Sequence, residues 1–177
     1  MKGLDFGSRK NLYKKYGLYA LVIIISAVCN LSGFIPDVFS AEAMIMVPLC
    51  VAIALHEKSI PGMAFGVLCG ALWDISSAQA DGYYTVMLAT AGFIAGSLSA
   101  FLMRNNVFSC ILLTFTSTAV CNIVHWVLFY LRKGYDGAFS ILFRYYLPSA
   151  VYTLVFGAIF YYVINYIYKE TKQKKKH

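Results

Sequence analysis

Four polar residues lie inside otherwise apolar stretches of this chain, and they are the residues best able to do chemistry there. Asp74 is an acid, His125 is a base, and Asn30 and Asn122 offer amides. An ionisable side chain inside a membrane is costly and counts as a candidate functional position, which makes Asp74 the foremost of the four. Asn122 and His125 are three residues apart and therefore share one helix face.

Two interpretations of this polar cluster are open. Its members could tie helices together through hydrogen bonds worth about 1 kcal/mol each. Alternatively, they could line a cavity or a docking face for a partner helix. Their positions along the apolar stretches place all four in the outer half of a membrane domain, and Asp74 meets Asn122 or His125 only if the third and fifth spans lie together.

Catalytic and metal-binding patterns are absent from the sequence. It contains no H-E-x-x-H, G-x-S-x-G or P-loop pattern, and no span carries a pair of carboxylates. The cysteines lie in apolar runs without a C-x-x-C pair, which predicts small buried residues rather than disulfides or a metal site; they are Cys29, Cys50, Cys69, Cys110 and Cys121. We therefore expect a protein that is not an enzyme and has no metal or cofactor.

The composition is that of an integral membrane protein. Of the 177 residues, 60% are hydrophobic and only 13% are charged, whereas soluble domains carry about 25% charged residues. The predicted fold is all-α, a bundle of six transmembrane helices at about 17–35, 38–55, 60–78, 83–103, 107–131 and 145–168. The second span is short, and Pro48 interrupts it. Residues 1–16 and 169–177 form basic segments on either side of this domain, which covers residues 17–168.

The basic residues predict the orientation. With both termini in the cytoplasm, 12 of the 15 Lys and Arg residues face inward and 3 face outward, as the positive-inside rule requires. The expected location is the cytoplasmic membrane, crossed several times. The basic ends favour contact with anionic lipid. The sequence has no basic stripe interleaved with stacking aromatics, so nucleic-acid binding is not expected. His56, next to Glu57 and Lys58, is predicted to lie in a solvated loop.

Small residues recur every four positions on the third and fourth spans, which predicts close helix packing. On the third span this repeat runs into Asp74. Because a short turn joins the two spans, we expect them to form a tight antiparallel hairpin at the centre of the fold. The packing residues are Gly62, Gly66 and Gly70 on the third span and Gly92 and Gly96 on the fourth.

This pattern resembles the MreD family of rod shape-determining proteins. The likeness rests on a third span that reads G-x-x-x-G-x-x-x-D, a turn of small residues and a fourth span with paired Ala–Gly steps. The residues that carry it are Gly66, Gly70 and Asp74, the turn Ser76–Ser77–Ala78 with Asp81–Gly82, and Ala91–Gly92 with Ala95–Gly96.

The resemblance implies a non-enzymatic scaffold subunit of the bacterial cell-elongation machinery, which builds peptidoglycan. Such a subunit binds MreC and, through it, links MreB filaments to RodA and a class B penicillin-binding protein. We expect the contact with MreC to involve Asp74 and the outer polar cluster.

The family is also similar in fold to the substrate-capture subunits of energy-coupling factor transporters, which supplies the alternative function. In that case Asn30, Asp74, Asn122 and His125 would hold a small solute in a cavity that opens outward. A paired ATPase module or a bound vitamin would then accompany the protein.

Overall fold

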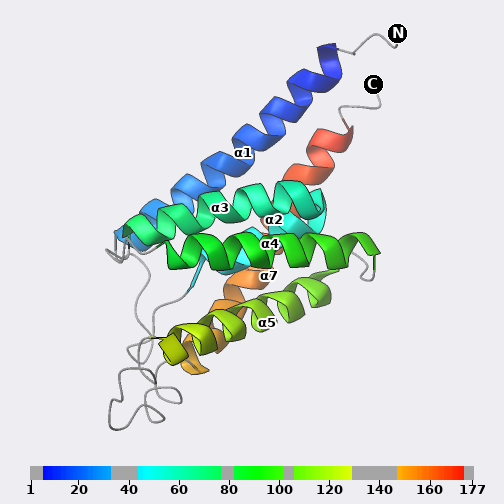
Figure 1. The fold of residues 1–177 in the computed structure, drawn as a ribbon. Helices are drawn as coiled ribbons and strands as arrows, with labels where there is room; N and C mark the ends of the chain where they lie inside the picture. The colour runs from blue at the N-terminus through cyan, green and yellow to red at the C-terminus, as the bar shows by residue number, and fades with distance from the viewer. Residues whose placement is uncertain (1–5, 33–43, 77–81, 102–105, 129–146, 174–177) are drawn as a thin grey trace.

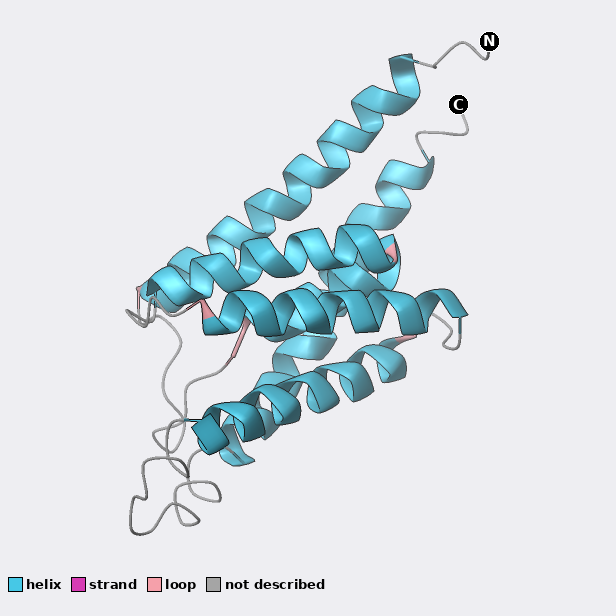
Figure 2. Cartoon of the chain, viewed as in Figure 1, coloured by secondary structure: helices cyan, strands magenta, loops and turns pink. Residues whose placement is uncertain are grey.

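The computed structural model describes residues 6–32, 44–76, 82–101, 106–128 and 147–173. These ranges contain six helices and no strand (Figures 1 and 2), which confirms the all-helical prediction. The helices are α1 (Phe6–Leu31), α2 (Met46–Glu57), α3 (Ser59–Ser76), α4 (Tyr83–Phe101), α5 (Val107–Trp126) and α7 (Leu147–Gln173). The predicted turn at Ser77–Asp81 and residues 129–146 lie outside the described residues.

The short helix α2 is the centre of the bundle. Each residue from Met44 to His56 is buried, and α2 packs against all five other helices. A helix that is apolar all round is typical of a position inside a bundle. Its 12 residues span about 18 Å, well short of the ~30 Å hydrocarbon core of a bilayer. The sequence placed a longer span at 38–55 and put the glycine hairpin at the centre of the fold, so α2 takes a place that was predicted for α3 and α4.

Both ends of α2 correct a prediction. Pro48 does not interrupt the helix, because it lies in the first turn, where the missing N–H has no intrahelical partner to lose. At the other end, α2 continues through His56 and Glu57, and only Lys58 separates it from α3. Lys58 has a φ of 74°, unusual for a residue other than glycine, and this reverses the chain within one residue.

The glycine repeats form the contact between α3 and α4, which lie side by side in Figure 1. A Cβ atom added at Gly62 would lie 2.8 Å from the Gly92 carbonyl oxygen, and one at Gly66 would collide with the Leu88 carbonyl. Gly96 in turn packs against the backbone of Lys58, 2.5 Å from an added Cβ. The helices approach backbone to backbone at each of these points, so no larger residue fits. We call this contact the glycine seam.

The other helices complete the enclosure of α2. Helix α7 packs against α2, α5 and α1, whereas α1 packs mainly against α7, α2 and α3. Figure 1 shows the start of α1 and the end of α7 extending beyond the rest of the bundle at the same end. Helix α1 begins at Phe6 and α7 continues to Gln173, so much of both basic segments is helical.

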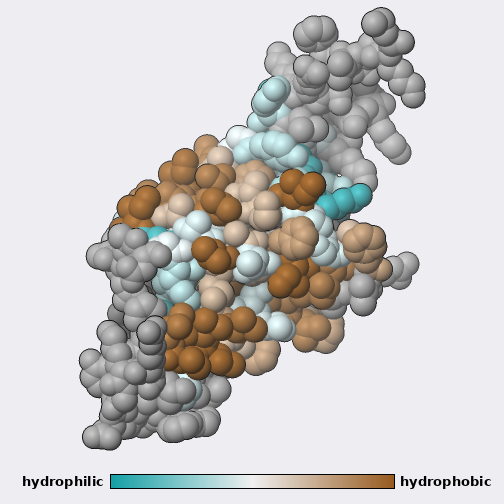
Figure 3. All heavy atoms as spheres, viewed as in Figure 1, coloured by the Kyte–Doolittle hydropathy of each residue, from teal (hydrophilic) through white to brown (hydrophobic). Residues whose placement is uncertain are grey.

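The outside of the bundle is rich in large apolar side chains (Figure 3). Ile60, Ile75, Phe101 and Phe108 are between 74% and 84% exposed. Helices α3, α4 and α5 are each long and apolar enough to cross a membrane. Apolar residues on the surface together with polar residues inside indicate a lipid environment.

Candidate functional site

Asp74 is buried and caps the first turn of α4. Its Oδ1 accepts a hydrogen bond from the backbone N–H of Tyr84 at 3.0 Å. Its Oδ2 accepts the backbone N–H of Thr85 at 2.9 Å and the Thr85 hydroxyl at 2.6 Å. The first N–H groups of a helix have no partner within that helix, and a negative charge near them is favourable. The Asp74 carboxylate of α3 therefore supplies hydrogen-bond acceptors and a negative charge to the unpaired N–H groups at the start of α4.

Gly70 makes this cap possible. It lies one turn before Asp74 on the same face of α3. A Cβ atom at Gly70 would lie 2.5 Å from the Tyr84 carbonyl oxygen and collide with Thr85 Cα. The last step of the glycine repeat thus brings the backbone of α4 within hydrogen-bonding range of the Asp74 carboxylate.

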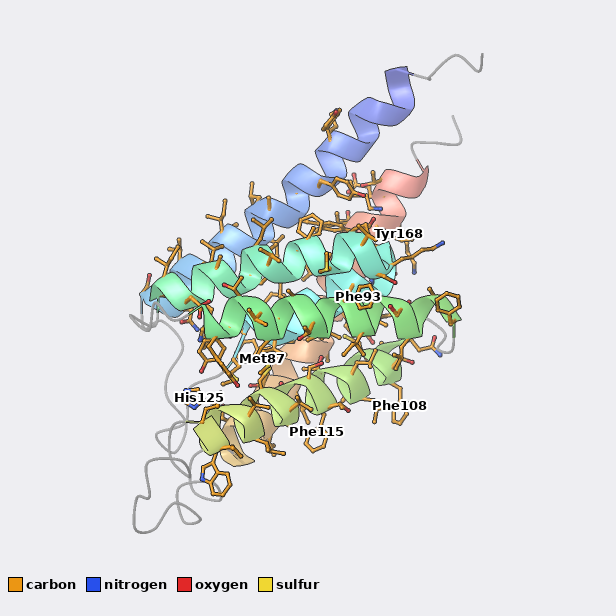
Figure 4. All side chains as sticks on the ribbon, viewed as in Figure 1. Met87, Phe93, Phe108, Phe115, His125 and Tyr168 are labelled. Atoms are coloured by element: carbon orange, nitrogen blue, oxygen red, sulfur yellow. The ribbon has the colours of Figure 1, made fainter. Side chains whose placement is uncertain are left out.

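Aromatic rings extend the site from α4 to α5. The Tyr83 hydroxyl donates to the Cys121 carbonyl at 2.7 Å. The His125 ring stacks on Tyr84, with centroids 6.1 Å apart, and meets Tyr83 edge-on at 5.5 Å. Trp73 of α3 packs against the other end of this group through Tyr84, at 5.7 Å. His125 is labelled in Figure 4. We call Asp74, Tyr83, Tyr84, Thr85 and His125 together the Asp74 cluster.

The structure brings together some of the four predicted polar residues. Asp74 and His125 belong to one cluster, with Tyr84 of α4 joining them. Asn122 lies one turn from His125 and is 3% exposed, on the side of α5 that faces the bundle. Asn30 is half-buried near the end of α1, whose main partners are α7, α2 and α3 rather than α4 or α5.

A second group of polar residues, which the sequence did not reveal, lies at the C-terminal end of α2, around Glu57. Lys15 of α1 forms an ion pair with Glu57, and the Tyr19 hydroxyl donates to the same carboxylate oxygen at 3.0 Å. The Lys15 ammonium also lies 4.6 Å from the centre of the Tyr168 ring, a favourable cation–π distance. These residues and His56 form what we call the Glu57 cluster.

His56 is buried in this cluster, so its predicted place in a solvated loop is wrong. It is 7% exposed and lies against Tyr161 and Tyr168, with ring centroids 5.5 and 5.2 Å apart. Its Nδ1 lies 2.9 Å from the Ala52 carbonyl, which fixes Nδ1 as the protonated nitrogen. A run of His, Glu and Lys reads as solvated when only its neighbours in sequence are considered. The packing of α1 and α7 onto α2 is what buries it.

Neither cluster has the composition of a metal centre. Among the described residues, no three His, Cys, Asp or Glu side chains come together in a way that could hold a metal ion. The five cysteines are free thiols, and all but Cys29 are buried. The Asp74 cluster, by contrast, has an evident structural effect, because it joins three helices at one end of the bundle.

Comparison with known proteins gives no relative for this chain: no family model, curated protein or solved structure matches it.

Proposed function

We propose that this protein is a non-enzymatic scaffold subunit of the bacterial cell-elongation machinery, of the kind formed by the MreD family. The observation that carries the proposal is that the residues of the resemblance belong to one structural unit. Gly66, Gly70 and Asp74 of α3 meet the backbone of α4 at Leu88, Thr85 and Tyr84. Gly92 of α4 meets Gly62 further along the same contact, and Gly96 meets the backbone of Lys58 and Ser59. The described residues that carry the resemblance are therefore residues that hold α3 against its neighbours.

In this proposal the protein crosses the cytoplasmic membrane several times, with both termini in the cytoplasm. The contact between Lys15 of α1 and Tyr168 of α7 supports a common side for the two ends. The six-span arrangement and the basic ends on anionic lipid are parts of the same proposal.

The proposed partner is MreC, and through it RodA, a class B penicillin-binding protein and MreB filaments. Because the Asp74 carboxylate already accepts three hydrogen bonds from α4, we assign it to building the docking surface rather than to touching the partner. The contact itself is assigned to exposed side chains nearby. Ile75 is the foremost of these, since it follows Asp74 directly and is 76% exposed.

The test is native co-purification of the tagged protein from mildly solubilised membranes, with identification of bound proteins and small molecules. We expect MreC to be recovered, and Ile75→Ala to recover less of it. Ile60→Ala is the matched control, because Ile60 is similarly exposed, at 74%, at the other end of α3. Failure to recover MreC would overturn the function, whereas equal recovery with both variants would overturn only the docking site.

The transporter alternative receives less support from the geometry. It requires Asn30, Asp74, Asn122 and His125 to face one solute, yet Asp74 is engaged with α4 and the helix of Asn30 packs mainly elsewhere. Recovery of a stoichiometric vitamin or a paired ATPase module in the same experiment would favour this alternative over the scaffold.

A further inference from the structure

Three exposed lysines flank the Glu57 cluster, and each is the neighbour in sequence of one of its members. They are Lys14 on α1, Lys58 after α2 and Lys169 on α7. The members that they flank are in contact, because Lys15 pairs with Glu57 and its ammonium lies 4.6 Å from the centre of the Tyr168 ring. The cluster therefore gathers the three lysines at the end of the bundle where Tyr168 is labelled in Figure 4. We call Lys14, Lys58 and Lys169 the lysine patch.

The lysine patch has an excess of positive charge. Within the described residues, Glu57 pairs with Lys15, and no acidic side chain pairs with a lysine of the patch. Of the described acidic residues, only Glu170 is both exposed and close in sequence to the patch. Both helices continue outward with further basic residues, Arg9 and Lys10 on α1 and Lys172 on α7. Positive charges gathered on one surface attract an anionic partner.

In the six-span arrangement proposed above, helix lengths put the patch at the edge of the membrane. Helix α1 rises about 26 Å from Lys14 to its last residue, and α7 rises about 33 Å from its first residue to Lys169. Both values are close to the ~30 Å thickness of the hydrocarbon core. Tyr13 and Tyr166 lie within one turn of these lysines and are 75% and 69% exposed. Because exposed tyrosines are typical of the membrane interface, the patch lies at the level of the lipid headgroups.

We propose that the lysine patch binds the phosphate groups of anionic phospholipids in the cytoplasmic leaflet. Lysine ammonium groups donate hydrogen bonds to phosphate oxygens, and the opposite charges strengthen these bonds. Leu18 lies one turn from Lys14 toward the membrane and is 44% exposed, so the acyl chains of the same lipid can cover it. An acidic protein surface would match the lysines but not this border of tyrosine and leucine. The inference rests on the proposed membrane placement, with both termini in the cytoplasm, and not on the identity of the partner protein.

The test is native mass spectrometry of the purified full-length protein in neutral detergent micelles. Phosphatidylglycerol is the anionic probe, and phosphatidylcholine with the same acyl chains is its neutral reference. We expect several-fold more bound phosphatidylglycerol than phosphatidylcholine at equal lipid concentration. Equal binding of the two lipids would overturn the proposal. Because MreC is absent from this experiment, either result leaves the co-purification test of the scaffold function unaffected.

Charge-matched variants show whether the patch itself is the binding site. Lys14→Gln, Lys58→Gln and Lys169→Gln, combined in one protein, should lower phosphatidylglycerol binding to the level of phosphatidylcholine. The control replaces Lys174, Lys175 and Lys176 with glutamine, which removes the same charge from the end of the chain and should change the binding little. The patch lysines are exposed and make no ion pair within the described residues, so both variants should keep the melting temperature of the parent.

Two outcomes with the folded variants would contradict the proposal. Equal losses in the patch variant and the control would mean that net charge alone attracts the lipid. Full phosphatidylglycerol binding by the patch variant would show that these lysines do not hold the headgroup, and an acidic protein surface would then be the better candidate for the patch.

Discussion

The Asp74 cap gives the sharpest prediction about stability. Asp74→Ala removes the acceptor of two backbone N–H groups in the first turn of α4 and of the Thr85 hydroxyl. The hydroxyl can rotate away from the site, but the two N–H groups are fixed by the helix and cannot. Each buried group left unsatisfied costs about 1–3 kcal/mol, and losing a helix cap costs about 0.5–2 kcal/mol. We expect a loss of about 3 kcal/mol, in the lower half of the ~2–6 kcal/mol for two unsatisfied N–H groups, because losing a cap alone costs less.

The buried thiols of the protein provide the assay. A dye that fluoresces on reaction with thiols reports unfolding, because Cys50, Cys69, Cys110 and Cys121 are buried in the native state. For a chain of this size, 1 kcal/mol shifts the melting temperature by about 2–4 °C, so Asp74→Ala should melt about 6–12 °C below the parent. Asp74→Asn should fall between the two, since its amide oxygen can accept one N–H while its NH₂ group cannot accept the other.

Ser76→Ala is the matched control. The Ser76 hydroxyl lies two residues further along the same helix and donates to the Leu72 and Trp73 carbonyls of that helix. Removing it should leave the melting temperature nearly unchanged. If Asp74→Ala and Ser76→Ala had the same melting temperature, the cap would not stabilise the hairpin. A direct role of the Asp74 carboxylate in partner binding would then be the better interpretation.

The remaining predictions concern the helix contacts and the ion pair. Gly66→Leu should prevent α3 and α4 from packing together, because even a Cβ atom at Gly66 collides with the Leu88 carbonyl. Size-exclusion chromatography should show a loss of folded protein, and Gly17→Leu is the control, because Gly17 has open space around it. Glu57→Gln should lower the unfolding free energy by about 3 kcal/mol, because it leaves the Lys15 charge without its partner in a partly buried site. The exchange of the two charges, Lys15→Glu with Glu57→Lys, should recover part of that loss in the thiol assay, and no recovery would mean that the ion pair contributes nothing.

The sequence predicted the hairpin well because the information is local. Small residues every four positions describe a helix face by themselves, and a short turn leaves an antiparallel neighbour as the simplest partner. Gly62 against Gly92 and Gly66 against Leu88 are what that argument requires. Asp74 was recognised as unusual for a similar reason, since one carboxylate in an apolar run stands out. Its acceptor role could not be read from the sequence, because the partner N–H groups belong to backbone and carry no side-chain signature.

The predictions failed where the answer depends on distant segments. His56 and Glu57 appear solvated next to Lys58, but Lys15 and Tyr19 of α1 and Tyr168 of α7 bury them. The central place of α2 is hidden in the same way. A short apolar run with a proline looks like a marginal span, whereas a helix enclosed on every side needs no length to match the membrane. Only the surrounding helices decide between these two possibilities.

Two kinds of helix contact therefore surround α2, and they differ in how tightly they are packed. The glycine seam joins α3 to α4 through backbone contacts that admit no extra atom, and α2 touches it through Ala54 at Gly62 and Cys50 at Gly92. The contact between α5 and α7 is less tight at Gly157, where an added Cβ atom would meet Thr114 at an ordinary contact distance of 3.5 Å. Close-packed backbone contacts resist change, whereas a less tightly packed contact rearranges at lower cost. A partner that docks beside Asp74 would meet the rigid half of the bundle, so any movement it causes should appear between α5 and α7.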